Sequence, residues 1–200
     1  MHFEEGYIYH IYNRGINNQK VFFSDDNYIY FLAKFKTEIY PICDILAYCL
    51  LPNHFHFLVQ TNKKSCLPYK TKTGKSTQAQ NLSKKFGLAL SSYTQGVNKR
   101  YNRTGNLFQQ RTKAKCLNLE FSKRDYLTIC FQYIHQNPFE AGLVDDLKDW
   151  PYSSFNEYLN RLDDGLCNLD LAYELIKLDW KDFYSQSLQI FDNEDLCNIL

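Results

Sequence analysis

The segment 43–60, CDILAYCLLPNHFHFLVQ, constrains the fold more than any other part of the chain. It contains two runs of apolar and aromatic residues, 43–51 and 54–60, which are separated only by Pro52 and Asn53. Runs of this length and composition predict β-strands, and a short link of proline and asparagine predicts a turn between them. The two strands should therefore pair in an antiparallel sheet that has an apolar face in the core.

Weaker patterns predict the other elements. Alternating apolar and polar residues predict a strand over 6–15, and 107–119 predicts a further strand or hairpin edge. Apolar residues spaced three or four apart, with capping residues and prolines near the ends, predict helices at 25–40, 80–101, 122–137, 150–159 and 169–178. The capping box at Ser122 should begin the third of these helices, and Pro138 should end it. The polar, basic segment 61–77 has no periodicity and predicts a mobile loop.

This order of elements, β-α-β-β-α-β-α, predicts the α+β class. An antiparallel sheet with helices packed mainly on one face is expected, as in ferredoxin-like and RRM-like domains. Hydrophobic residues make up 44% of the chain and aromatic residues 16%, which is typical of a globular protein. We expect one domain over 1–160 and an acidic, helical extension over 161–200 packed on the same domain.

Targeting signals and cysteine patterns indicate the cellular compartment in which the protein is expected. The first residues include no basic segment followed by an apolar one, and no apolar run approaches the ~18–20 residues of a membrane span. A cytoplasmic protein without membrane contact is therefore expected. The seven cysteines are scattered and include no CxxC pair. This pattern argues against a disulfide framework or a zinc knuckle.

Charge is distributed very unevenly along the chain, although the formal net charge is only +1. Residues 45–119 contain 13 lysines and arginines and no acidic residue, whereas 161–200 contains nine acidic residues against three basic ones. A protein surface normally interleaves both signs. The basic stretch is better explained by a polyanionic partner, with nucleic acid the leading candidate and a solvated basic face the alternative.

His54 and His56 are the first candidates for chemistry. In a strand, residues i and i+2 point to the same side, so the two imidazoles project together while Phe55 and Phe57 face the other way. Two such imidazoles can bind one metal ion. Two histidines with ordinary hydrogen-bond partners are the alternative, and the pair alone does not decide between them.

The helix expected to end at Asn137 supplies a possible third ligand. Tyr133 and Asn137 are four residues apart and therefore share one face of that helix. If this face packs against the histidine strand, Asn137 offers an amide oxygen to a metal and Tyr133 offers a phenol beside it. Tyrosine is abundant in this chain, so the spacing alone does not single out Tyr133. His10 and His135 are weaker candidates for the same site.

Four motifs in a fixed order resemble a known family. LPNHFHFLV, NRTGNLFQQR, YIHQNP-x-x-AGLV and WPYSS are similar to the single-tyrosine transposases of the HUH (His-hydrophobe-His) endonuclease superfamily. More closely, the chain resembles the REP-associated tyrosine transposase branch, and the opening YHIYNRG and the helix SYTQGVNKRY support this. The resemblance covers residues 6 to about 159.

The resemblance implies a site and a reaction. His54, His56 and Asn137 would bind a divalent metal ion, Mg²⁺ or Mn²⁺, and Tyr133 would be the nucleophile. Such proteins have a palm-like sheet and nick single-stranded DNA, often next to a hairpin. They leave a 5′-phosphotyrosyl link and a free 3′-OH. Some relatives act as homodimers and others as monomers, so the oligomeric state stays open.

Basic residues near the motifs are expected to contact DNA phosphates, with Tyr101 and Phe108 as stacking surfaces. They are Arg14, Lys99, Arg100, Arg103, Arg111, Lys113 and Lys115. The alternative to a DNA-cleaving enzyme is a protein of the same fold that binds structured DNA or RNA without cutting it.

Overall fold

A four-stranded antiparallel sheet forms the centre of the molecule. The computed structural model describes residues 1–118, 125–162, 164–189, 191, 197 and 199–200. The sheet has the order β2-β3-β1-β6, and all three neighbouring pairs are antiparallel. Its strands are β1 (Ile8–Arg14), β2 (Cys43–Leu51), β3 (His54–Thr61) and β6 (Lys113–Cys116). The hairpin predicted over 43–60 is thus present, and the expected α+β class is confirmed.

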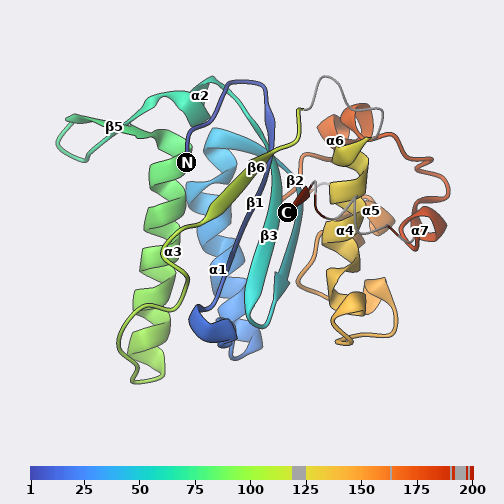
Figure 1. The fold of residues 1–200 in the computed structure, drawn as a ribbon, viewed down its shortest axis with the longest axis horizontal. Coiled ribbons are helices and arrows are strands. Elements are labelled where there is room, and N and C mark those ends of the chain that lie inside the picture. Colours follow the sequence, from blue (N-terminus) through green and yellow to red (C-terminus); the bar gives the residue numbers. More distant parts are fainter. Residues whose placement is uncertain (119–124, 163, 190, 192–196, 198) are drawn as a thin grey trace.

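Helices cover both faces of this sheet (Figure 1). One face is covered by α1 (Asp25–Glu38) and α3 (Asn81–Arg100). The other face is covered by the helices α4 (Tyr126–Glu140), α5 (Phe155–Asn160), α6 (Leu169–Leu175) and α7 (Phe183–Gln186). Short 3₁₀ turns lie at η1 (Ile16–Asn18), η2 (Tyr40–Ile42) and η3 (Leu147–Asp149).

The expectation that helices pack mainly on one face was therefore wrong, and β2 shows why. Ile45 and Leu50 face α1 and α3, whereas Leu46 and Cys49 face α4, and all four side chains are fully buried. A strand that is apolar on both faces must be covered on both faces.

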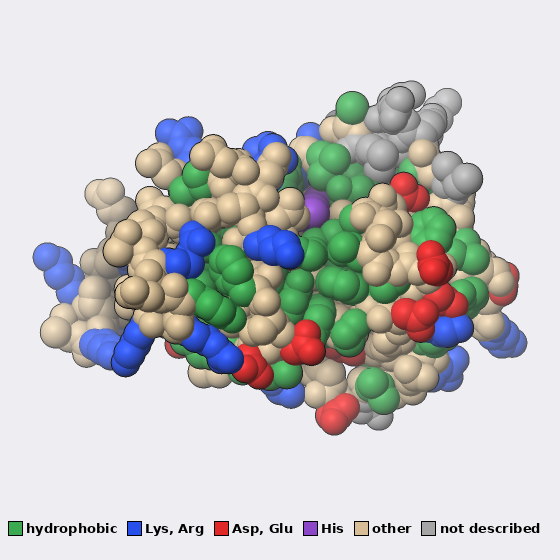
Figure 2. Space-filling model, turned by 90° about the horizontal axis from the view of Figure 1, so that it is seen from below, with side chains coloured by type: hydrophobic (Ala, Val, Ile, Leu, Met, Phe, Trp, Pro, Cys, Tyr) green, Lys and Arg blue, Asp and Glu red, His purple; other side chains and the backbone are tan. Residues whose placement is uncertain are grey.

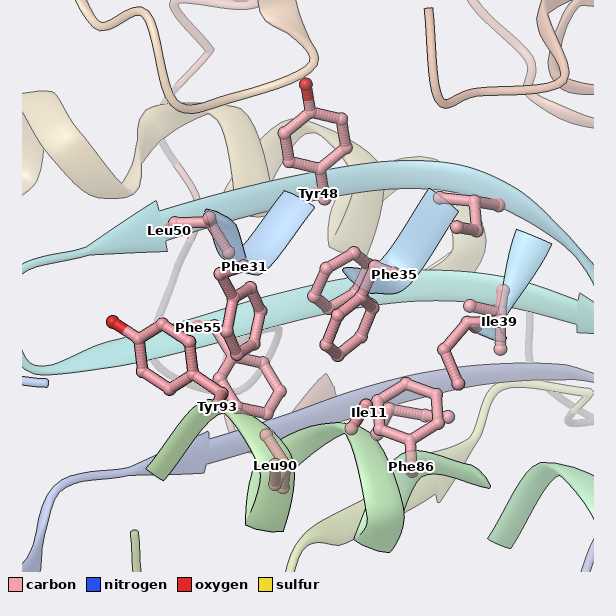
Figure 3. Close-up of a cluster of buried hydrophobic side chains, with 14 of the residues drawn as sticks. Ile11, Phe31, Phe35, Ile39, Tyr48, Leu50, Phe55, Phe86, Leu90 and Tyr93 are labelled. Carbon is pink, nitrogen blue, oxygen red and sulfur yellow. The ribbon is translucent and has the colours of Figure 1, made fainter. Parts of the chain in front are cut away.

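Aromatic side chains fill the space between the sheet and the helices α1 and α3 (Figure 3). Phe31 and Phe35 of α1 lie with ring centroids 4.4 Å apart, and Phe35 stacks on Phe57 of β3 at the same distance. Phe86 of α3 meets the Phe35 ring edge-on at 5.1 Å. This packing fixes the apolar face of β3 and, with it, the direction of the residues on the opposite face.

The segment predicted as a mobile loop, 61–77, is ordered instead. It forms α2 (Lys63–Cys66), β4 (Pro68–Lys70) and the start of β5 (Ser76–Gln80), and β4 and β5 pair as a separate hairpin. The side chain of Asn62 caps α2 by accepting hydrogen bonds from backbone amides. Because backbone pairing and caps carry this structure and most of its side chains are exposed, it leaves no hydrophobic periodicity in the sequence.

The predicted end of the third helix was also wrong. The helix α4 continues past Pro138 to Glu140. A proline has no backbone N–H and so removes one hydrogen bond from the helix. The last turn is still closed, because the Ala141 amide donates to the carbonyl of Asn137. Ser122 lies outside the described residues, while Asp125 caps α4 by accepting from the Thr128 amide.

The described part of 161–200 contributes to the core on the α4 face. Leu169, Ala172, Ile176 and Phe183 are buried there. The boundary between a domain at 1–160 and an extension at 161–200 stays a prediction. Among the described residues, no helix combines the length and the apolar character that crossing a membrane requires.

The aromatic packing predicts a large cost for truncating Phe35. Phe35→Ala should lower the free energy of unfolding by about 3–5 kcal/mol, because it removes a fully buried ring and leaves a cavity. Ile29, on the same helix, is 61% exposed, so Ile29→Ala should change it by no more than about 0.5 kcal/mol. Urea unfolding followed by circular dichroism measures both values. Equal losses in the two variants would contradict this account of the core.

Candidate active site

The register between β1 and β3 assembles polar side chains on the sheet face that α4 covers. His54 pairs with Arg14 and His56 pairs with Tyr12. The intervening Phe55 and Phe57 lie in the aromatic core on the other face. The prediction that the two histidines project together, away from the phenylalanines, is confirmed.

Helix α4 places Tyr133 directly over this face. The ring centroid of Tyr133 lies 5.6 Å from that of His56, with the two rings edge to face. Asn137, one turn later, interacts with both the His54 imidazole and the Tyr133 phenol. Its amide nitrogen donates to the backbone carbonyl of Tyr133 at 2.7 Å, and Asn137 is absent from the residues that line the cavity described next. The helix face that carries Tyr133 and Asn137 therefore lies against the histidine strand, which is the condition that the sequence left open.

One cavity joins most of these groups. It is lined by both histidines and Tyr133, by three basic side chains, and by polar and aromatic neighbours from β1 and the segment before β6. Its lining residues are Tyr12, Asn13, Arg14, Asn18, Asn53, His54, Phe55, His56, Gln109, Arg111, Lys113, Tyr133 and Leu200. No acidic side chain is among them, so the cavity suits an anionic ligand.

Each of the two imidazoles uses its Nδ1 in a hydrogen bond to a neighbouring side chain. Nδ1 of His54 lies 2.7 Å from Oδ1 of Asn53, and Nδ1 of His56 lies 2.8 Å from Nε2 of His10. Nε2 of His56 is buried and has no hydrogen-bond partner within the described structure. Burial lowers the pKa of both imidazoles, and that of His56 falls well below its ordinary value. Neutral imidazoles with an unused nitrogen are what metal coordination requires.

The donor set fits a divalent cation. No three His, Cys, Asp or Glu side chains in the described ranges are grouped so that they could hold a metal ion. The set expected from the sequence is of another kind, because its third member would be the amide oxygen of Asn137. The unpartnered Nε2 of His56 is the observation that supports metal binding, since a buried acceptor without a partner is costly.

Burial also sets the ionisation of Tyr133. It raises the pKa of the phenol to about 12, although the Asn137 amide acts in the opposite direction. At neutral pH the side chain is therefore a phenol. A positive charge beside its oxygen would lower this pKa and make the phenolate easier to form.

Known proteins resemble this chain in sequence and in fold. No protein-family model matches the chain. A Haemophilus influenzae protein named as a REP-associated tyrosine transposase is 30% identical over 122 residues, which is 60% of this chain and 62% of that protein. A solved structure of a REP-associated tyrosine transposase bound to a REP hairpin superposes with a TM-score of 0.56 and 15% identity, over 83% of this chain and 87% of the other. The chain resembles REP-associated tyrosine transposases in sequence and in fold.

The chain spans about three fifths of the length of the Haemophilus influenzae relative. A bacterial tRNA(His) guanylyltransferase-like protein in complex with GTP superposes at a TM-score of only 0.39, which does not indicate a shared fold.

The basic residues predicted to contact nucleic acid fall into two groups. Arg14, Arg111 and Lys113 line the cavity, and Lys115 follows two residues later on the same strand. In the view of Figure 2, from below that of Figure 1, most lysine and arginine side chains lie on the half of the molecule toward α3.

The second group, Lys99, Arg100 and Arg103, lies at the end of α3 and outside the cavity lining. Arg100 pairs with Asp26 at 2.7 Å. The guanidinium of Arg103 lies over the ring of Phe23 and donates to Gln19. The structure does not bring this group to the histidines, and its contact with nucleic acid stays a prediction.

Sequence reasoning missed Asn53 and gave too little weight to His10. Asn53 looked like a turn residue only, and no spacing rule would have assigned it to His54. His10 could have been found from alternation, because β1 places it on the same face as Tyr12 and Arg14. His135, the other weak candidate, is buried away from the cavity against the hydroxyl of Ser154.

The burial of Tyr133 predicts a measurable shift in its ionisation. In the native protein at pH 10, about 1% of this side chain should be ionised, against about half in the unfolded chain. At this pH we compare the absorbance at 295 nm of the wild type with that of Tyr133→Phe. The difference should be near zero in buffer, and in guanidinium it should equal the absorbance of about half a tyrosinate per chain. An equal difference in both solvents would contradict the assigned burial.

Proposed function

We propose that the chain is a metal-dependent endonuclease and strand transferase for single-stranded DNA, cleaving near hairpins through a 5′-phosphotyrosine intermediate. The observation that carries the proposal is the convergence of Tyr133 with His54 and His56 in a cavity whose charged residues are all basic. The likeness to a REP-associated tyrosine transposase bound to a REP hairpin supports the choice of hairpin DNA.

Tyr133 is the group positioned for attack. In the proposed step its hydroxyl oxygen forms a bond to phosphorus, the bond from phosphorus to the 3′ oxygen breaks, and the released 3′-OH carries a proton in place of the one lost by the phenol. The DNA fragment that carries the phosphate on its 5′ end stays attached to Tyr133 as an ester. Because one phosphoester replaces another, the 3′-OH of a second strand can reverse the step and rejoin the DNA.

The neighbouring residues bind and orient the phosphate. Arg14, Arg111 and Lys113 would offset its charge, and the His56 ring, edge to face with Tyr133, helps to hold the phenol. Nε2 of His54 and of His56, with Oδ1 of Asn137, would hold Mg²⁺ or Mn²⁺. Such an ion, when bound, withdraws charge from a non-bridging phosphate oxygen.

A protein that binds structured DNA or RNA without cleaving it is the second candidate. It would need the basic cavity and the fold. Binding alone does not require a buried imidazole nitrogen that lacks a hydrogen-bond partner, nor a tyrosine beside that imidazole. This pairing favours the enzyme.

A covalent adduct is the direct test of the enzyme. Labelled single-stranded oligonucleotides with hairpins, incubated with Mn²⁺ or Mg²⁺, should give a protein–DNA band that survives denaturing electrophoresis. Tyr133→Phe should abolish this band and still bind the DNA. His54→Ala should also abolish it, because cleavage needs the metal site.

Tyr126→Phe is the matched control, because this tyrosine lies on the same helix and is also largely buried. It should keep the adduct. If the adduct forms with Tyr133→Phe but not with Tyr126→Phe, the nucleophile is Tyr126 and not Tyr133. Absence of any adduct in the wild type, with DNA binding intact, would favour the non-cleaving protein.

Salt dependence tests the role of the cavity lysine. Lys113→Ala should weaken binding to a single-stranded oligonucleotide and reduce the slope of log K against log salt by about 0.7, the value for one lost phosphate contact. Lys84 is exposed on α3 and absent from the cavity lining, so Lys84→Ala should leave the slope unchanged. Fluorescence anisotropy over a salt series measures both. Equal slopes in the two variants would mean that Lys113 does not contact a DNA phosphate.

A further inference from the structure

A buried chain of hydrogen bonds runs from a backbone carbonyl to the unpartnered nitrogen of His56. The carbonyl oxygen of Ile199 lies 2.6 Å from Nδ1 of His10. Nε2 of His10 lies 2.8 Å from Nδ1 of His56. His10 is fully buried and His56 is 3% exposed. At the far end of this chain, Nε2 of His56 faces no partner within the described residues.

The first member of the chain determines the direction of every proton in it. A carbonyl oxygen only accepts, so Nδ1 of His10 must carry a proton and donate it to Ile199. In a neutral ring, Nε2 of His10 is then an acceptor, and Nδ1 of His56 must donate to it. The remaining nitrogen of His56, Nε2, keeps its lone pair.

We propose that His10 is a positioning residue that holds His56 in the tautomer with a proton on Nδ1, so that Nε2 of His56 is available to a divalent cation. This inference rests on the proposed function, because it assigns a role to His10 within the same site. His10 is not itself a ligand, since both of its ring nitrogens are already occupied. Outer hydrogen bonds of this kind fix the orientation and tautomer of metal-binding histidines.

The geometry around His10 supports a role in orientation as well. Its ring stacks on that of His56 with centroids 5.0 Å apart and planes inclined by 21°. The ring of Tyr133 lies edge-on to His10 at 6.2 Å. His10 therefore contacts a proposed ligand and the proposed nucleophile while leaving both free to act.

The second proposed ligand has an equivalent support from a different residue. Oδ1 of Asn53 lies 2.7 Å from Nδ1 of His54 and accepts its proton, which leaves Nε2 of His54 with its lone pair. Both imidazoles are thus held through Nδ1 by a neighbouring side chain.

Two substitutions of His10 separate positioning from packing. His10→Leu removes the acceptor for His56, and Mn²⁺ affinity, measured by electron paramagnetic resonance on the DNA-free protein, should fall about 10- to 100-fold. His10→Gln places a side-chain carbonyl near the former Nε2, can accept the same proton, and should restore most of the affinity. Equal Mn²⁺ affinity in the wild type and in a folded His10→Leu would overturn the proposal. Equal losses of Mn²⁺ affinity in folded His10→Leu and folded His10→Gln would also overturn it.

A spectroscopic measurement keeps the proposal testable if His10→Leu does not fold. Long-range ¹H–¹⁵N correlation spectra of the metal-free wild type should show His56 with its proton on Nδ1. A proton on Nε2 would overturn the proposal.

The outcomes also separate this proposal from the proposed function. A wild type that binds Mn²⁺ in the manner described but forms no covalent adduct with DNA would refute the proposed cleavage and leave the role of His10 standing. A wild type that binds no Mn²⁺ would overturn the role of His10 together with the metal site.

Discussion

The register between β1 and β3 is the constraint on which the site depends. It sets His54 across from Arg14 and His56 across from Tyr12, so that two imidazoles and a guanidinium share one face of the sheet. A shift by one residue would turn His54 and His56 into the aromatic core and Phe55 toward the cavity. The cost of burying two imidazoles among phenylalanine rings, and of exposing a ring to water, excludes that alternative. The packing that stabilises the fold therefore also aligns the site.

The position of α4 over this face is the second requirement, and the C-terminal part of the chain meets it. Gln132 of α4 donates to the backbone carbonyl of Gln186, and Gln136 donates to that of Ser187. These bonds hold a helix whose other face carries Tyr133. Residues far from the cavity thus determine how close the phenol comes to the histidines.

Much of this arrangement could be predicted from the sequence, and the exceptions have physical causes. The strands 43–51 and 54–60 and the shared direction of His54 and His56 follow from a period of two residues. The hairpin β4–β5 was missed because exposed strands held by backbone bonds leave no apolar pattern. The tautomer of His56 was beyond any pattern, because it depends on the carbonyl of Ile199, which is 143 positions away in the sequence. Local rules describe single elements, whereas the site is built from contacts between them.

In the proposed site, Nε2 of His54, Nε2 of His56 and the amide oxygen of Asn137 would bind a cation next to Tyr133. Anomalous diffraction from a crystal of the DNA-free protein soaked in Mn²⁺ tests it most directly. The predicted result is a single strong peak bonded to Nε2 of His54 and Nε2 of His56, with the side-chain oxygen of Asn137 beside it and Tyr133 within reach of the same ion. A peak bonded to His10, or no peak in this cavity under conditions that saturate Mn²⁺ binding in solution, would contradict the account.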